Sequence, residues 1–231
     1  MLNLLVAYLD ETYLKGKEHA LIALVLPAHK IAELEAALDK VVEKAQRQHD
    51  LDVELELHGY ELSGGTGCWK GLAPRARVRI YQDAVDAIAS IEGAAICHGS
   101  VDLSTRAPQD AHMWALTIAL ERVNHCAYWL DQKVIGICDD VGNKVVYQRM
   151  YAHSRKQGTP GSSGNRLSSF TDGLHFTPSC YSRPVQAVDL VAYVYRRVMI
   201  TPHQDPRAHK AMLDMYQALE PLWERGFHRK W

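Results

Sequence analysis

The sequence lacks an excess of charge of either sign. Its 231 residues include 26 Lys and Arg against 27 Asp and Glu, which leaves a formal net charge of −1 at pH 7. A protein that binds nucleic acid through its overall charge is strongly basic, so any such contact here must use local groups. Long hydrophobic runs are also lacking, because the longest, such as ALIALVLPA, are too short to cross a bilayer. We therefore expect a soluble protein with no membrane partner.

The chain has no C-x-x-C motif, and its five cysteines are an odd number. Free thiols in a reducing compartment fit this pattern, so we expect a cytoplasmic protein. The pairs Cys97–His98 and His125–Cys126 lack the ligand spacing of a zinc site and do not predict one. The N-terminal MLNLLVAYLDE has no basic start, and its apolar run stops at two carboxylates. We expect a buried strand there rather than a signal peptide.

Several motifs of common enzyme classes are missing as well. The loop GGTGCWKG has neither the residue order nor the flanking strand and helix of a phosphate-binding loop. No G-x-S-x-G elbow marks a serine hydrolase. No G-x-G-x-x-G follows a strand, so a dinucleotide-binding fold is not indicated.

Hydrophobic periodicity and turn residues predict alternating strands and helices. The order indicates an α/β fold with a mixed central sheet and flanking helices. We expect a single domain over residues 1–231, with a C-terminal helical extension at about 205–231. The expected strands are 2–9, 19–26, 52–62, 94–103, 133–140 and 174–178, with a hairpin between the first two. The expected helices begin at Pro27 and cover 76–91, 110–130, 184–197 and 208–223, and residues 154–169 are expected to form a mobile surface loop.

Carboxylates stand beside apolar runs in three of these strands and one helix. If the strands are neighbours, their ends bring several acids together, and a helix laid across the sheet adds another. Crowded carboxylates repel one another unless a cation lies among them, and magnesium prefers such oxygen ligands. The residues concerned are Asp10 and Glu11, Glu54 and Glu56, Asp139 and Asp140, and Asp189.

Each acid also has an ordinary structural interpretation. Acids at strand ends commonly act as turn residues or caps, and Asp189 on its helix could simply face water. Successive residues of a strand point to opposite faces, so the sequence does not decide between Asp139 and Asp140. His58 follows Glu56 on the same expected strand face. It could carry a proton, orient or bind a metal ligand, or be a polar residue on the solvent side.

Four motifs in order resemble a known family. They are AYLDET at 7–12, ELHG at 56–59, ICDD at 137–140 and SCYSRPVQAVDLVA at 179–192. Together they resemble the family catalogued as domain of unknown function 3800 (DUF3800), whose members are similar to ribonuclease H-like enzymes. The chain departs from the family pattern at Val188, where Ala is usual, and at Pro178, where an Asp often precedes the serine.

The resemblance implies a ribonuclease H-like sheet with acids at its centre. Carried over by position, the acidic set would be Asp10, Glu56, Asp139 and Asp189, with His58 and Gln186 nearby. Glu11 and Asp140 rank lower, since each should point away from its neighbour. The resemblance also suggests a bacterial or phage origin, with a role in defence or in a toxin-like system.

From these patterns we expect a divalent-metal-dependent nuclease that hydrolyses phosphodiester bonds of RNA or DNA. Mg²⁺ or Mn²⁺ would be held by the acidic set and would activate water for attack on phosphorus. Arg155, Lys156 and Arg166 in the expected loop could hold the nucleic-acid backbone. Two alternatives stay open: a non-catalytic module of the same fold that binds nucleic acid or protein, and a phosphohydrolase for small nucleotides. The sequence does not indicate the oligomeric state.

Overall fold

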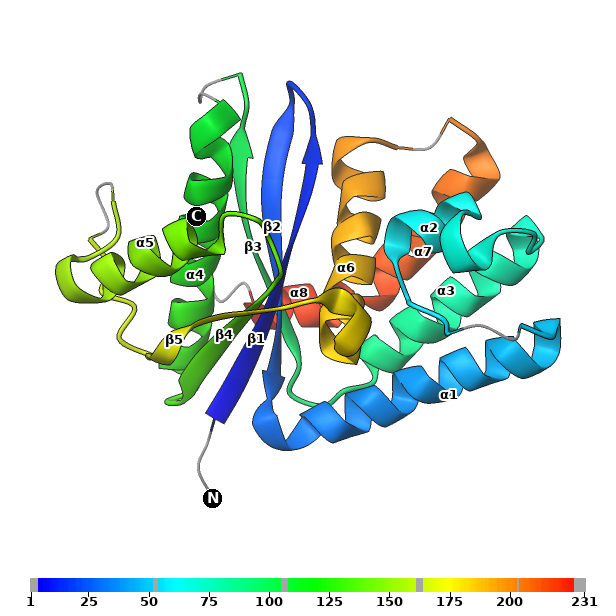
Figure 1. The fold of residues 1–231 in the computed structure, drawn as a ribbon, viewed down its shortest axis with the longest axis horizontal. Coiled ribbons are helices and arrows are strands. Elements are labelled where there is room, and N and C mark those ends of the chain that lie inside the picture. Colours follow the sequence, from blue (N-terminus) through cyan, green and yellow to red (C-terminus); the bar gives the residue numbers. More distant parts are fainter. Residues whose placement is uncertain (1–3, 52–53, 105–107, 161–163, 203, 227–231) are drawn as a thin grey trace.

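A five-stranded sheet divides the protein into two layers of helices (Figure 1). The computed structural model describes residues 4–51, 54–104, 108–160, 164–202 and 204–226. The strands are β1 (Leu4–Leu14), β2 (Glu18–Pro27), β3 (Ala95–Asp102), β4 (Lys133–Asp139) and β5 (Phe170–Thr177). Their order across the sheet is β3-β2-β1-β4-β5, so β1 is the central strand.

The sheet is mixed, as the sequence predicts. β1 pairs antiparallel with β2 through a hairpin, and β2 pairs antiparallel with β3. β4 runs parallel to β1, and β5 runs parallel to β4. Continuous apolar runs form β1 and β2 because helices cover both faces of the sheet. The expectation of an α/β fold with flanking helices is therefore confirmed.

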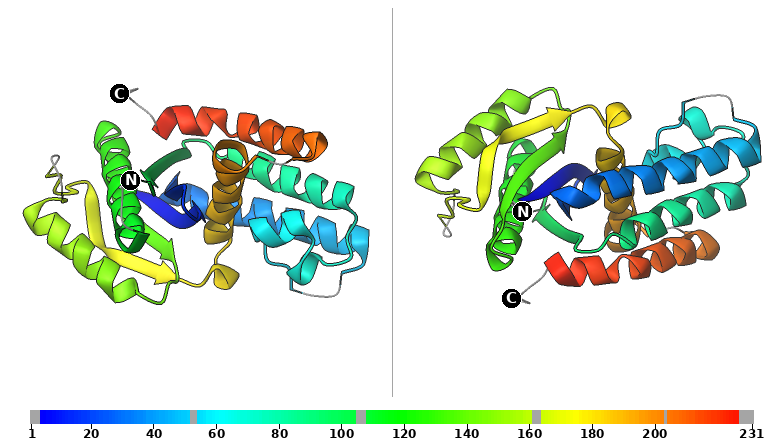
Figure 2. Two further views of the ribbon diagram at one scale, coloured as in Figure 1. Left: turned by 90° about the horizontal axis from the view of Figure 1, so that it is seen from above. Right: turned by 90° about the horizontal axis from the view of Figure 1, so that it is seen from below.

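Two helices cover one face of the sheet, and the others lie on the opposite side (Figure 2). The first group is α4 (Pro108–Trp129) and α5 (Lys144–Gln157). On the other face, α6 (Arg183–Tyr195) lies against β1 and β2 and is in turn covered by α1 (Ile31–His49) and α3 (Pro74–Ala89). The remaining helices are α2 (Gly59–Gly64), α7 (Pro206–Ala218) and α8 (Glu220–Gly226), with short 3-10 turns at Ala28–Lys30, Gly67–Trp69 and Ser179–Tyr181 and a π-helical turn at Arg196–Ile200.

The core has one part on each side of the sheet, and β1 contributes to both. Val6 and Tyr8 pack with residues of α6, whereas Leu5 and Leu9 pack with residues of α4. This alternation continues along the strand, because successive side chains point to opposite faces. Residue 10 therefore faces the α6 side, and residue 11 faces the α4 side.

The first strand is longer than its apolar run predicts. We expected it to stop before Asp10, but its antiparallel pairing with β2 continues to Leu14. Its parallel pairing with β4 stops at Leu9, which lies opposite Cys138. Asp10 and Asp139 thus come directly after the last paired residues of these two neighbouring strands. The two acids therefore lie at the same end of the β1–β4 pairing, as expected, although β1 itself continues past Asp10.

The predicted third strand, at 52–62, is wrong. Residues 54–58 form no strand, and Gly59 begins helix α2; residues 52 and 53 lie outside the described residues. The alternating pattern reflects burial alone, because Leu55 and Leu57 are buried while Glu56 is partly exposed. The segment runs along α6 and does not join the sheet. Glu54 is exposed and does not share a strand face with Glu56.

The surface loop expected at 154–169 is also partly wrong. Helix α5 continues to Gln157, so Arg155 and Lys156 lie on a helix. We did not predict this helix, since only Tyr151 and Ser154 are buried along it and no strong apolar stripe marks it. Residues 161–163 lie outside the described residues.

The C-terminal helices α7 and α8 join the main core. Met215 of α7, together with Leu222 and Trp223 of α8, packs into the cluster on the α6 side of the sheet. The predicted helix at 208–223 is divided between these two helices, and residues 227–231 of the expected extension are outside the described part. Within the described residues, no helix has the length and hydropathy needed to cross a membrane.

Candidate active site

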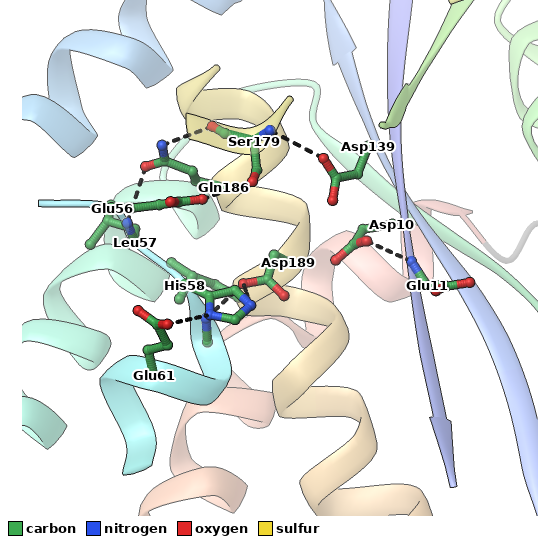
Figure 3. Close-up of polar contacts among 12 residues, drawn as sticks. Asp10, Glu11, Glu56, Leu57, His58, Glu61, Asp139, Ser179, Gln186 and Asp189 are labelled. Carbon is green, nitrogen blue, oxygen red and sulfur yellow. Dashed lines mark hydrogen bonds and ion pairs between the residues drawn. The ribbon is translucent and has the colours of Figure 1, made fainter. Parts of the chain in front are cut away.

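Three carboxylates from separate elements face one another between the sheet and α6 (Figure 3). Asp10 comes from the central strand β1, and Asp139 ends the neighbouring strand β4. Asp189 lies on α6, and its carboxylate points towards that of Asp10. The ordinary interpretation, in which Asp189 faces bulk water, is therefore wrong: its side chain is only 20% exposed.

Asp139, and not Asp140, belongs to this group. Oδ1 of Asp139 accepts the backbone N–H of Asp140 at 2.9 Å and that of Ser179 at 3.1 Å. Asp140 is exposed and pairs with Lys144, whose Nζ lies 2.8 Å from its Oδ1. The structure thus decides between two neighbouring acids that the sequence left open.

Asp189 is held by the turn that begins α2. The N–H of Gly59 donates to Oδ2 of Asp189 at 2.6 Å. Nε2 of His58 lies 4.0 Å from the same oxygen, and Nδ1 of His58 lies 4.0 Å from Oε1 of Glu61. Only glycine fits at position 59 without a shift, because a Cβ there would lie 2.7 Å from Cβ of Tyr193. This close packing brings His58 to the border of the acidic group.

Glu56 is connected to the acidic group by hydrogen bonds of Ser179. The hydroxyl of Ser179 donates to Oε1 of Glu56 at 2.7 Å, while its backbone N–H binds Asp139. Ser179 therefore links Glu56 to the carboxylates of the sheet. We gave this serine no role from the sequence, although it opens the last of the four family-like motifs.

Gln186 positions the segment that carries Glu56. Its side chain is 2% exposed, accepts the N–H of Leu57 at 3.1 Å and donates to the carbonyl of Ser179 at 2.9 Å. Arg183 adds a bond from Nη1 to the carbonyl of Leu55 at 3.0 Å, and Trp69 donates from Nε1 to the carbonyl of Glu56 at 2.9 Å. Side chains thus supply the backbone partners that a strand ladder would otherwise provide.

Burial and mutual repulsion disfavour the charged forms of these acids. Burial raises the pKa of Asp10 well above its ordinary value, and the charges of Asp189 and Asp139 raise it further. Burial also raises the pKa of Asp189, against the opposing effects of His58 and the Gly59 N–H. Burial likewise raises the pKa of Asp139, although the N–H groups of Asp140 and Ser179 favour its charged form. The neighbouring hydrogen-bond donors therefore do not fully offset the effects of burial and mutual repulsion on these carboxylates.

The donor set fits a hard divalent cation. In the part of the chain that the structure describes, His58 is the only basic side chain that forms an ion-pair contact with these carboxylates, at 4.0 Å from Asp189. Asp10, Asp139 and Asp189 do not form a closed site around one ion, since no three described acids of this group have ligand atoms all within 4.8 Å of one another. Magnesium is usually bound by one or two protein carboxylates and takes water or substrate phosphate as its other ligands, so it does not require all three acids to converge.

The remaining predicted site residues lie elsewhere. Glu11 points to the opposite face of the sheet, as strand alternation predicts, and binds His112. Arg155 and Lys156 are exposed on α5, which is on the other side of the sheet from α6 (Figure 1). Nη1 of Arg155 donates to the carbonyl of Asp172 at 2.6 Å. Arg166 is exposed as well. The structure does not bring these three cations to the acidic group.

Comparison with known proteins adds no relative. No family model and no curated protein matches this chain.

Proposed function

We propose that the protein is a divalent-metal-dependent nuclease with a ribonuclease H-like fold, and that it hydrolyses phosphodiester bonds of RNA or DNA. One observation carries this proposal: the carboxylates of Asp10, Asp139 and Asp189 face one another in a partly buried site. The central position of β1 supports it too, because the resemblance to DUF3800 implies acids at the centre of the sheet.

The acids would hold Mg²⁺ or Mn²⁺ at the edge where β1 and β4 stop pairing. When bound, such ions activate water for attack on phosphorus and stabilise the leaving oxygen. Asp10 and Asp139 stand on adjacent strands, so their spacing is fixed by the sheet. Asp189 faces them from α6. Glu56, which accepts a hydrogen bond from Ser179, would be the fourth acid of the group.

His58 would move a proton during the reaction. Its side chain is 41% exposed and its Nε2 lies 4.0 Å from Asp189, so it has access both to solvent and to the acidic group. Histidine is the side chain that most often transfers protons in enzyme active sites. Glu61, 4.0 Å from Nδ1, would fix the orientation of the ring.

A cleavage assay with a matched pair of variants tests this function. Single-stranded and duplex RNA and DNA and an RNA–DNA hybrid are incubated with the full chain in EDTA, magnesium or manganese. We expect cleavage of at least one substrate with metal and none in EDTA. Asp10→Asn should abolish cleavage, because a neutral amide is a poorer ligand for a hard cation.

Asp140→Asn is the control, since Asp140 carries the same charge but pairs with Lys144 outside the group. It should keep its activity. Equal activity of Asp10→Asn and wild type would refute the mechanism. Binding of nucleic acid without cleavage under every metal condition would favour a non-catalytic module, and cleavage of free nucleotides alone would favour a small-nucleotide phosphohydrolase.

A further inference from the structure

A second cluster of metal-binding side chains lies on the opposite face of the sheet from Asp10. It consists of Glu11 on β1, His19 on β2 and His112 on α4. Nδ1 of His112 lies 2.6 Å from Oε2 of Glu11, and Nε2 of His19 lies 3.6 Å from the same oxygen. The two ring nitrogens are 3.3 Å apart. Three donor atoms from three elements therefore converge on one point.

The strand register explains this convergence. Leu21 lies opposite Glu11, and His19 lies opposite Tyr13. Glu11 and His19 are thus diagonal neighbours on one face of the hairpin, within reach of long side chains. His112 stands four residues before Leu116, which is buried against this face. A residue one helical turn away points in the same direction, so His112 also faces the hairpin.

The three separations are close to those of ligands around one ion. Ligands about 2.0–2.1 Å from a tetrahedral zinc ion are separated by about 3.3–3.4 Å. Two of the observed separations, 3.3 Å and 3.6 Å, are near this value. Only the pair at 2.6 Å, between His112 and Glu11, must open to admit an ion. Glu11 is 36% exposed and retains side-chain freedom for that change.

Glu11 forms a hydrogen bond with His112, whereas its ion-pair contact with His19 at 3.6 Å is too long for a hydrogen bond. Nδ1 of His112 carries at most one proton, and its bond to Glu11 uses that proton. His19 nevertheless brings a further ring nitrogen to 3.3 Å from Nδ1. A hydrogen bond between two ring nitrogens needs a proton on one and a free lone pair on the other, and Nδ1 of His112 has no free lone pair while it donates to Glu11. A metal ion between the two nitrogens would bind a lone pair of each ring.

Aromatic side chains hold both imidazole rings in place. The ring of Tyr147 lies 4.4 Å from that of His112. The ring of Tyr13 is stacked on His19 at 5.8 Å, with an angle of 9° between the planes. The two histidines are 13% and 17% exposed, so their ring nitrogens are shielded from most of the solvent. Such packing fixes the directions in which the ligand atoms point.

We propose that Glu11, His19 and His112 bind a zinc ion, with water in the fourth position. Two imidazoles and one carboxylate are typical of zinc, whereas magnesium prefers oxygen ligands. The ion would connect the β1–β2 hairpin to the first turns of α4, on the face of β1 opposite to Asp10. The site is independent of the proposed nuclease function, because none of its ligands belongs to the acidic group on the other face.

Calorimetric titration of the EDTA-treated and dialysed full chain with zinc chloride tests this site. We expect one equivalent of zinc to bind in the presence of millimolar magnesium. His19→Gln should lower the zinc affinity more than about 100-fold, beyond the cost of losing an outer partner of a ligand. This variant leaves the hydrogen bond between Glu11 and His112 intact, so the loss of affinity would report on His19 as a ligand.

Two control variants separate this site from other acids and histidines. His175→Gln removes an exposed histidine that pairs with Asp172 at 3.0 Å, and it should bind zinc as the wild type does. Asp189→Asn disturbs the acidic group alone and should also keep full zinc affinity. Loss of zinc binding in Asp189→Asn would assign the ion to the acidic group and overturn the proposal. Equal zinc affinity of His19→Gln and wild type would overturn it as well.

A measurement on the wild-type chain keeps the test decisive if His19→Gln does not fold. Cobalt(II) replaces zinc in such sites and reports their geometry through its visible absorption. We expect the intense bands of tetrahedral coordination, bleached by one equivalent of zinc. The weak bands of octahedral cobalt(II), or no change on adding zinc, would overturn the proposal.

Discussion

Replacement of Asp189 by asparagine tests whether Asp189 is a metal ligand or a buried acid with no metal-binding role. Asparagine keeps the shape of the side chain and can still accept the N–H of Gly59, which lies 2.6 Å from Oδ2. It removes the negative charge that faces Asp10 across the site. The substitution therefore changes the electrostatics of the group with little change in packing.

Without metal, two effects of this substitution oppose each other. A hydrogen bond to a charged acceptor is worth about 1 kcal/mol more than one to a neutral acceptor, and the attraction to His58 at 4.0 Å is also lost. Burial and the charge of Asp139 nevertheless raise the pKa of Asp189 despite these favourable contacts. The charged form is thus disfavoured on balance, by about 1.4 kcal/mol for each pKa unit. We expect the metal-free variant to melt at the wild-type temperature or above it.

With magnesium bound, the wild type should melt at a higher temperature than Asp189→Asn. Free magnesium at a hundred times its Kd stabilises the wild type by about 2.7 kcal/mol. For a chain of this size, 1 kcal/mol corresponds to about 2–4 °C, so the melting temperature should rise by about 5–11 °C. If loss of the carboxylate weakens binding about 100-fold, the same magnesium concentration leaves about 0.4 kcal/mol, or about 1–2 °C.

Thermal melts in EDTA and in millimolar magnesium measure both effects. Asp140→Asn is the matched control, because Asp140 is exposed and paired with Lys144. It should show the full rise of the wild type. Equal magnesium-induced rises for Asp189→Asn and wild type would refute the assignment of Asp189 to a metal site.

Two further predictions follow from the contacts of the site. In EDTA, the free energy of unfolding of the wild type relative to that of Asp10→Asn should decrease as the pH rises from about 4, because Asp10 keeps its proton in the folded protein at pH values where the unfolded chain has lost it. Urea titrations of both proteins at several pH values measure this difference, and a difference that does not change with pH would contradict the raised pKa. Gln186→Leu should destabilise the protein by about 1–3 kcal/mol, because it leaves the buried Leu57 N–H without a partner and removes one of the two hydrogen bonds to the Ser179 carbonyl. Gln82→Leu, which removes an exposed bond to Asp86, should change stability by less than about 0.5 kcal/mol in the same urea titration, and a similar loss in both variants would argue against the bridging role of Gln186.

Strand periodicity was sufficient to predict how β1 presents its acids. Leu5 and Leu9 face α4 while Val6 and Tyr8 face α6, so the opposite orientations of Asp10 and Glu11 follow from counting residues. The pairing partners could not be predicted in this way. That β4 lies beside β1 and stops pairing at Leu9 depends on contacts more than a hundred residues apart.

The same periodicity gave a wrong strand at 52–62. Alternating burial shows that a segment is extended with one side covered, but it does not show which groups bind its backbone. Here the covering element is α6, and Gln186 and Arg183 bind the backbone in place of a neighbouring strand. Helix α5 was missed for a related reason, since it buries few residues and its sequence carries little periodic signal.

No sequence pattern indicated that the histidines of the second cluster lie together. His19 and His112 are 93 residues apart and belong to no motif with ligand spacing. The register of the hairpin and the packing of α4 against the sheet bring them together, and neither can be read from the residues around each histidine.

The attachment of residues 54–58 has a consequence for the dynamics of the acidic group. Three of the bonds that hold this region come from Gln186, Arg183 and Asp189, all on α6. Leu55 and Leu57 are also buried in the core on this side of the sheet, so apolar packing adds to these bonds and keeps the segment on α6. Any shift of α6 would therefore move Glu56, His58 and Asp189 together, whereas Asp10 and Asp139 are held by the pairing of β1 and β4.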